Sequence, residues 1–99
     1  MRVIQFNGSD VREIDIDNTL EALRQAVRGN ISIVELIPDH AVMVVNQDGR
    51  YHQMKPNIMA SSIAGEKIAG PALAIGIDGR HFASLSPEIA RHIKMRCNV

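Results

Sequence analysis

The sequence has few aromatic residues and no excess of charge of either sign. Its 99 residues include one Tyr, two Phe and no Trp, and the formal net charge is +0. Proteins that bind single-stranded DNA or RNA stack the bases on aromatic side chains. Nucleic-acid-binding domains in general carry a basic surface. The composition therefore argues against duplex nucleic acid as a partner.

Cysteine and long apolar runs are also scarce. Cys97 is the only cysteine, which excludes a disulfide within the chain and a thiolate metal cluster. No apolar run approaches the ~20 residues of a membrane-spanning helix. The opening MRVIQFNGSD lacks the apolar segment of a secretory signal. We therefore expect a cytoplasmic protein without membrane contact, folded as a single domain over residues 1–99.

The charges present are divided unequally between the two halves of the chain. Residues 1–48 contain four arginines and eight acidic residues, a net charge of −4, whereas residues 49–99 contain seven basic and three acidic residues, a net charge of +4. Such polarity is compatible with self-association, as a homodimer or larger homo-oligomer, or with a partner surface of mixed sign. The alternative is that the fold interleaves the halves and mixes the charges in space.

The first thirty residues predict a β-hairpin followed by a helix. VIQF and VREIDI flank Asn7-Gly8, a pair typical of tight turns. A helix is expected at about 19–28, with Asn18 as its N-cap and Gly29 ending it. Glu21 would complete a capping box, and the buried helix face would consist of Leu20, Leu23 and Val27.

The middle of the chain predicts a further group of strands. ISIVEL at 31–36 and AVMVVN at 41–46 read as strands. AVMVV is apolar on both faces, which predicts a central position that is covered on both sides or packed in a dimer. Asp48-Gly49 would then turn the chain into a third strand at 50–54. After Pro56, Asn57 would cap a short helix through Ile63 that ends at Gly65.

The last third predicts a hairpin and a final helix. In ALAIGI at 72–77 one face carries Leu, Ile and Ile, and the other carries Ala, Ala and Gly, so that a helix or backbone can approach the small side. Asp78-Gly79 is expected to turn the chain into RHFASL. Ser86 and Pro87 have the properties of an N-cap and first residue of a helix. Its core-facing residues would be Ile89, Ile93 and either Met95 or Cys97.

These elements define the expected fold class. The order is β-β-α-β-β-β-β-β-α, with an irregular segment at 55–67 between the fifth and sixth strands. The expected fold is an α+β domain with a mostly antiparallel sheet of hairpins and the helices on one side.

No group of residues has the pattern of a catalytic or metal site. The four histidines lack metal-ligand spacing, and Ser61-Ser62 has no nucleophile context. The segment from Gly65 to Gly70 has the glycine spacing of a phosphate loop without its Lys and Ser/Thr. We therefore expect no catalytic residue, no metal and no cofactor. An enzyme using His52, or Glu13 with Asp15, is the weakest of three alternatives.

The residues with binding chemistry gather around NQDGRYHQMKPN at 46–57. Arginine suits phosphates because its guanidinium forms paired, charge-assisted hydrogen bonds, and a second Asp-Gly turn at 78–79 is also followed by arginine. Hairpin chemistry accounts for the turns but not for the basic residues. The candidate binding residues are Asn46, Arg50, His52, Lys55, Asn57, Arg80 and His81.

Several short motifs, in order along the chain, resemble one protein family. They are LEALRQAVRGNISIV, VVNQDGRYHQMKPN and IAGPALAIGIDGRHFASLSPEI. They resemble a family of small proteins from phages, plasmids and their bacterial hosts, known only as a domain of unknown function. Asn30 stands where the family often has a second glycine. The matching positions are Leu20, Leu23, Gln25, Val27, Gly29, Val45, Asn46, Gly49, Pro56, Asn57, Ile68 and Gly70.

Two functions follow as expectations. The resemblance implies a mobile-element setting, where small proteins often antagonise host defence, so the first expectation is a non-enzymatic protein that binds a host protein such as a defence effector. The alternative is a small-ligand binder that sequesters a nucleotide signal. Its phosphates would be held by Arg50, Lys55 and Arg80, with 57–70 as a lid.

Overall fold

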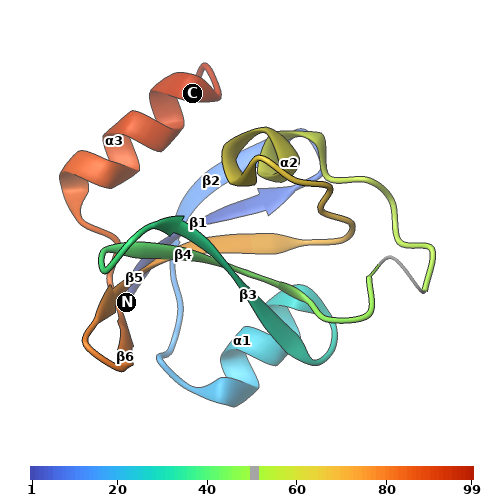
Figure 1. The fold of residues 1–99 in the computed structure, drawn as a ribbon, viewed down its shortest axis with the longest axis horizontal. Coiled ribbons are helices and arrows are strands. Elements are labelled where there is room, and N and C mark those ends of the chain that lie inside the picture. Colours follow the sequence, from blue (N-terminus) through green and yellow to red (C-terminus); the bar gives the residue numbers. More distant parts are fainter. Residues whose placement is uncertain (50–51) are drawn as a thin grey trace.

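The computed structural model describes residues 1–49 and 52–99 (Figure 1). Strands form a single sheet, and helices pack on both of its faces. The elements are β1 (Arg2–Asn7), β2 (Asp10–Asp15), α1 (Leu20–Val27), β3 (Ile31–Ile37), β4 (Ala41–Asn46), α2 (Ile58–Ala64), β5 (Ala72–Asp78), β6 (His81–Ala83) and α3 (Pro87–Arg96). The expected α+β class with a mostly antiparallel sheet is confirmed.

The sheet is built around β5. Its strand order is β2-β1-β5-β4-β3, with β6 also paired to β5, and every pair is antiparallel. One edge of β5 pairs with β4 along Ala72–Gly76, and its other edge is divided between β1 and β6. β5 therefore joins the first hairpin, β1–β2, to the second, β3–β4.

β4 and β5 form the centre of the sheet, as their apolar sequences predict. Every residue of β4 is buried. On β5, the small side chains Ala72 and Ala74 face one cluster of core residues, and Leu73 and Ile75 face the other. The alternation expected from ALAIGI is confirmed.

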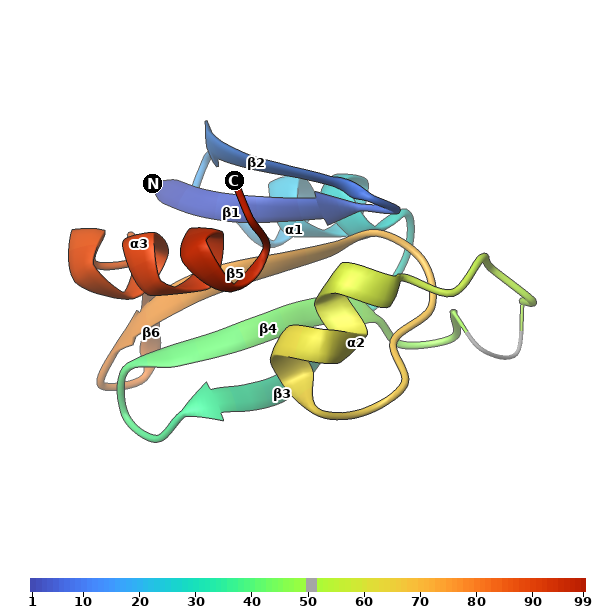
Figure 2. The same ribbon diagram turned by 90° about the horizontal axis from the view of Figure 1, so that it is seen from above.

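The helices lie on opposite faces of the sheet, and this differs from the expectation that they gather on one side. Leu23 and Val27 of α1 pack with Leu73 and Ile75. α2 and α3 pack with the small face of β5 and with Phe6. Figures 1 and 2 show the sheet between α1 and the other two helices. β4 and β5 are apolar on both faces, so each face needs a cover.

The start and end of α1 differ from the expected positions by one residue. Thr19 is the N-cap, and its hydroxyl accepts a hydrogen bond from the Ala22 amide at 3.1 Å. Asn18 instead donates from its side chain to the Phe82 carbonyl at 2.8 Å. At the other end Arg28, rather than Gly29, has the left-handed conformation, with φ of 65°. The expected capping box is therefore wrong, and Leu20 is 49% exposed rather than buried.

The caps expected for the other two helices are confirmed. Asn57 caps α2, and Gly65 ends it with φ of 74°. Ser86 caps α3, with Pro87 in its first turn. Of the two alternatives for the last core position of α3, Cys97 is buried and Met95 is exposed.

The strand expected at 50–54 is wrong for the described residues 52–54, which form a turn and an irregular segment. The amide of His52 donates to the Asp48 carbonyl at 2.9 Å, and that of Met54 donates to Gly49 at 3.0 Å. β4 pairs with β3 on one edge and β5 on the other, so it has no free edge for a hairpin partner. Within the described residues, no helix is long and apolar enough to cross a membrane.

Candidate functional site

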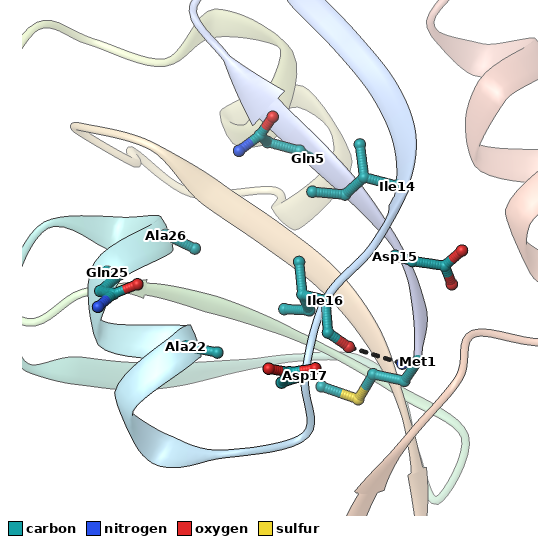
Figure 3. Close-up of a pocket in the computed structure, with 9 residues that line it drawn as sticks. All are labelled: Met1, Gln5, Ile14, Asp15, Ile16, Asp17, Ala22, Gln25 and Ala26. Atoms are coloured by element: carbon teal, nitrogen blue, oxygen red, sulfur yellow. Dashed lines mark hydrogen bonds between the residues drawn. The ribbon is translucent and has the colours of Figure 1, made fainter.

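A broad cleft lies between α1 and the first hairpin (Figure 3). It forms because α1 packs on β3, β4 and β5 and leaves the inner face of β2 partly uncovered. The cleft has a volume of about 630 Å³ and is open to solvent. Ile14, Ile16, Ala22 and Ala26 supply apolar surface, and the other lining residues are Met1, Gln5, Asp15, Asp17 and Gln25.

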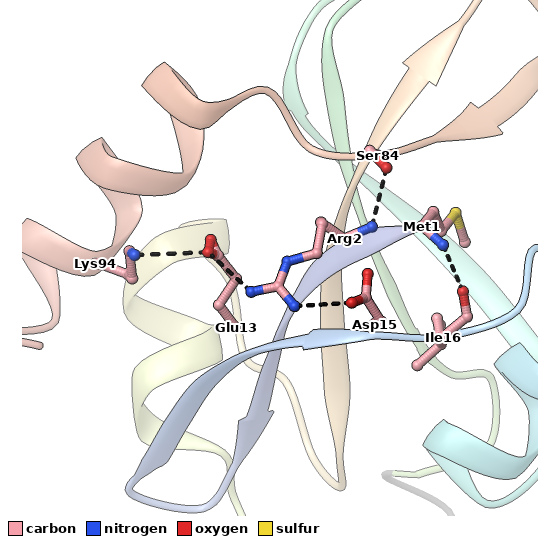
Figure 4. A network of polar contacts seen from close by, with 7 residues as sticks. All are labelled: Met1, Arg2, Glu13, Asp15, Ile16, Ser84 and Lys94. Carbon is pink, nitrogen blue, oxygen red and sulfur yellow. Dashed lines mark hydrogen bonds and ion pairs between the residues drawn. The ribbon is translucent and has the colours of Figure 1, made fainter.

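The acidic face of β2 is occupied by ion pairs (Figure 4). The Arg2 guanidinium lies 3.0 Å from an Asp15 carboxylate oxygen and 3.5 Å from one of Glu13. The Lys94 ammonium lies 3.7 Å from Glu13. The hydrogen bond that the Arg2 guanidinium donates to Asp15 is the largest cause that raises the pKa of Arg2. These contacts connect α3 with the first hairpin, so Glu13 and Asp15 have a structural role in this arrangement.

Asn46 holds the end of α1 against the end of β4. Its side-chain nitrogen donates to the Val27 carbonyl at 2.9 Å, and its oxygen accepts from the Asp48 amide at 2.8 Å. Gly29 leaves room for this amide, because a Cβ there would lie 2.9 Å from the Asn46 nitrogen. Asn46 is buried and its polar atoms have partners within the chain.

Asn57 is the second buried asparagine, and it is 1% exposed. Its side-chain nitrogen donates to the carbonyls of Phe6 and Gly70, each at 2.9 Å. Its oxygen accepts from the Ala60 amide at 3.2 Å, which caps α2. The side-chain nitrogen and oxygen of Asn57 are therefore bonded within the protein rather than directed at a ligand.

The exposed candidate residues lie in two separate places. His52 and Lys55 follow the end of β4, near the start of β5, because Val45 pairs with Ala72. Arg80 and His81 lie at the turn after β5. Seven residues of strand span roughly 20 Å, so Lys55 and Arg80 do not lie together in the one phosphate site that the sequence suggested. Arg50 lies outside the described residues.

A smaller hollow lies at the end of the sheet beside Lys55. It has a volume of about 300 Å³. Arg28 reaches it from the end of α1, and sequence reasoning did not select this residue because nothing in its spacing relates it to Lys55. The other lining residues are Asn7, Gly8, Met54, Pro56, Asn57, Gly70 and Pro71.

The two outer strands of the sheet differ in character. β2 reads DVREID and carries four charged side chains, whereas β3 reads ISIVELI and carries only Glu35. Within the described residues, β3 pairs only with β4, so its outer edge is unpaired. Ile33 is 45% exposed at this edge. β3 has one irregularity, a bulge between Glu35 and Ile37.

One hollow adjoins β3 on the face covered by α2, and a second hollow shares residues 67–69 with it. The first, of about 250 Å³, is lined by Ser32 and Val34 of β3 and by the segment 66–69. The second, of about 500 Å³, is mainly apolar and includes Ile58, which is 68% exposed. The residues lining both are Lys67, Ile68 and Ala69.

The architecture defines a small α+β domain in which one antiparallel sheet separates a single helix from a helix pair. The described residues contain no group of three or more His, Cys, Asp or Glu side chains placed to hold a metal ion. Residues 1–98 match the domain of unknown function DUF3846, and the chain belongs to this family. Comparisons with curated proteins and with solved structures return no match.

Proposed function

We propose that the protein is a non-enzymatic interaction protein that binds another protein by adding a strand of that partner to the outer edge of β3. The observation that supports this most is the outer edge of this seven-residue, largely apolar strand, an edge that has no pairing partner among residues 1–49 and 52–99. An unpaired edge presents amide and carbonyl groups to any extended segment, and peptide recognition often uses such an edge.

The contrast with β2 favours β3 as the binding edge. Proteins protect exposed edges from unwanted pairing with charged side chains, and β2 carries Asp10, Arg12, Glu13 and Asp15. β3 has one charge in seven residues. The sheet is therefore protected at one end and open at the other.

The surroundings of β3 indicate the chemistry of the partner strand. Val34 lines the smaller hollow, which continues towards Ile58 through the shared segment 67–69. A partner with apolar side chains at alternate positions would fill this surface, since successive side chains of a strand point to opposite faces. A basic side chain opposite Glu35 would add an opposite-charge cross-strand pair.

The biological part of the proposal follows from the resemblance to phage and plasmid proteins. The partner would be a host protein, with a defence effector as the first candidate, and binding would take place in the cytoplasm.

The test places a photo-crosslinking side chain on the proposed edge in cells that express the protein. Ile33→p-benzoylphenylalanine is compared with Leu20→p-benzoylphenylalanine, because Leu20 is an apolar residue of similar exposure on α1. We expect a cross-link to a host protein at position 33 and not at position 20. Reconstitution with that purified protein should protect β3 amides from hydrogen exchange.

Two outcomes would reject the proposal. One is a cross-link at position 33 to a second copy of the chain only, with a dimer in native mass spectrometry, which would make β3 a self-association edge. The other is equal cross-linking at the two positions without protection of β3.

A further inference from the structure

The hollow beside Lys55 is formed by four segments that are far apart in the sequence. They are the turn of the first hairpin at Asn7 and Gly8, the end of α1 at Arg28, residues 54–57, and Gly70 with Pro71. Hydrogen bonds fix two of these segments to each other, because the Gly70 amide donates to the Lys55 carbonyl at 2.9 Å. The hollow is therefore part of the folded framework.

Its floor is also fixed. The Asn57 side chain donates to the carbonyls of Phe6 and Gly70, so it connects the floor to β1 and to the start of β5. Gly70 has φ of 86°, and a Cβ there would lie 2.8 Å from the Met54 sulfur. A larger residue at position 70 would thus disturb the wall next to Met54.

The charge of the lining is positive. Among the residues that the structure describes, Arg28 and Lys55 are the charged residues that line the hollow, and no acidic residue lines it. The ion pairs found among residues 1–49 and 52–99 involve Arg2, Arg12 and Lys94 as the cations. Neither Arg28 nor Lys55 has a carboxylate partner in this part of the chain.

The backbone of Arg28 gives a second and independent observation. Arg28 ends α1 with φ of 65°, a conformation in which glycine is favoured and a residue with a Cβ is strained. The next residue is Gly29, so the glycine lies one position after the residue that has the left-handed conformation. Backbone strain of this kind is concentrated at functional sites, and here it places a guanidinium at the hollow.

We propose that this hollow binds a small phosphate-bearing anion, with the Arg28 guanidinium and the Lys55 ammonium as its ligands. Guanidinium groups suit phosphate oxygens because they offer parallel, charge-assisted hydrogen bonds. A volume of about 300 Å³ accommodates one phosphate with a small attached group. The site is separate from the β3 edge, and it replaces the Arg50–Lys55–Arg80 arrangement suggested by the sequence.

The test measures binding of inorganic phosphate and of adenosine monophosphate by amide NMR titration at low ionic strength, with sodium chloride as the reference salt. In the wild-type protein we expect both probes to shift the amides of Gly8, Lys55 and Gly70. Raising the salt concentration should weaken this binding, because exposed charges are screened. Tighter binding of the nucleotide would identify an organic phosphate as the ligand class, and equal binding would identify free phosphate.

Two variants remove the proposed ligands. In Arg28→Gly, binding should weaken roughly ten-fold or more, in line with loss of one charge-assisted contact, while the melting temperature should stay the same or rise because glycine suits the backbone. Lys55→Gln should weaken binding similarly. Arg91→Gln on α3 removes the same charge from an exposed position, so its affinity should remain within about two-fold of wild type.

In Arg28→Gly the affinity for the probes should fall while the melting temperature does not, so weaker binding could not be attributed to unfolding. The proposal is wrong if the variant binds both probes as tightly as wild type, or if Arg91→Gln weakens binding to the same degree. It is also wrong if the wild-type shifts fall on α3 instead of the hollow. None of these readouts depends on a protein partner at β3.

Discussion

The side-chain amide of Asn57 donates a 2.9 Å hydrogen bond to the main-chain carbonyl of Phe6, which lies 51 residues earlier in the chain. The same nitrogen donates to the Gly70 carbonyl, and the side-chain oxygen caps α2. One buried side chain thus connects β1, the first turn of α2 and the residues before β5. This relationship explains why asparagine at this position has a structural role.

Asn57→Ala should therefore be among the most destabilising polar substitutions in the protein. Loss of a helix N-cap costs about 1 kcal/mol, and each buried carbonyl left without a donor costs about 1–3 kcal/mol. We expect the free energy of unfolding to fall by about 3 kcal/mol, measured by urea denaturation. Asn57→Asp retains the capping oxygen but not the donors, so a stability equal to wild type in that variant would contradict the role of the two donated bonds.

The start of α1 can be tested by comparing two neighbouring residues. Thr19→Ala removes the hydroxyl that accepts from Ala22 and should lower the free energy of unfolding by about 1 kcal/mol. Asn18→Ala removes an exposed hydrogen bond to Phe82 and should cost about 0.5 kcal/mol. Thermal melts followed by circular dichroism would measure both, and a larger loss for Asn18→Ala would place the cap at Asn18.

Gly76 allows the chain after β6 to lie close to β5. A Cβ at this position would lie only 2.4 Å from the Ser84 carbonyl oxygen, and a backbone atom cannot rotate away as a side chain can. Gly76→Ala should therefore cost about 2–3 kcal/mol of stability. Gly65→Ala is the comparison, because Gly65 has φ of 74° with open space around it, and it should cost about 1 kcal/mol. Similar losses in the two variants would show that the close approach at Gly76 relaxes easily.

The buried thiol of Cys97 predicts a dependence of stability on alkaline pH. Burial raises the pKa of this thiol, an effect that the nearby Arg96 charge partly offsets. The unfolded chain releases the proton near pH 9.0, and the folded protein releases it at higher pH. The stabilisation is therefore complete below about pH 9 and is lost as the pH rises through the folded value.

The measurement compares melting temperatures of the wild type and Cys97→Ala between pH 7.5 and 10. The variant should be less stable by about 1 kcal/mol at pH 7.5, and the difference should shrink above pH 9. In the native protein, Cys97 should react with a thiol reagent roughly ten-fold or more slowly than in urea. Rapid labelling of the native protein would contradict the burial of the thiol.

Much of the fold could be predicted from local patterns. AVMVV at 41–45 indicates a central strand because it is apolar on both faces, and β4 is central. Ser86-Pro87 marks the start of α3 because both residues favour the first turn of a helix. The strand expected at 50–54 is absent from the described residues 52–54, because β3 and β5 already occupy both edges of β4, and only the sheet order reveals this.

The candidate site could be predicted only in part. Lys55 and Asn57 were selected from their chemistry, and both line the hollow at the end of the sheet. The buried, fully bonded state of Asn57 was not visible in the sequence. Arg28 was not predicted, because it is far from Lys55 in the sequence. Only the packing of α1 on the sheet brings the end of this helix to the hollow beside Lys55. The Asp-Gly turn at 78–79 resembles the earlier one in sequence and lies at the opposite end of β5.

The position of β5 has a consequence for synthesis on the ribosome. The hairpins β1–β2 and β3–β4 each consist of neighbouring segments, so each can pair as soon as it emerges. They cannot join until Ala72–Asp78 has left the exit tunnel, because β5 lies between them. Until then the edge of β4 that pairs with β5 is open, and such exposed strand edges favour aggregation. A nascent chain that stalls before residue 72 should therefore be the form of this protein that most needs a chaperone.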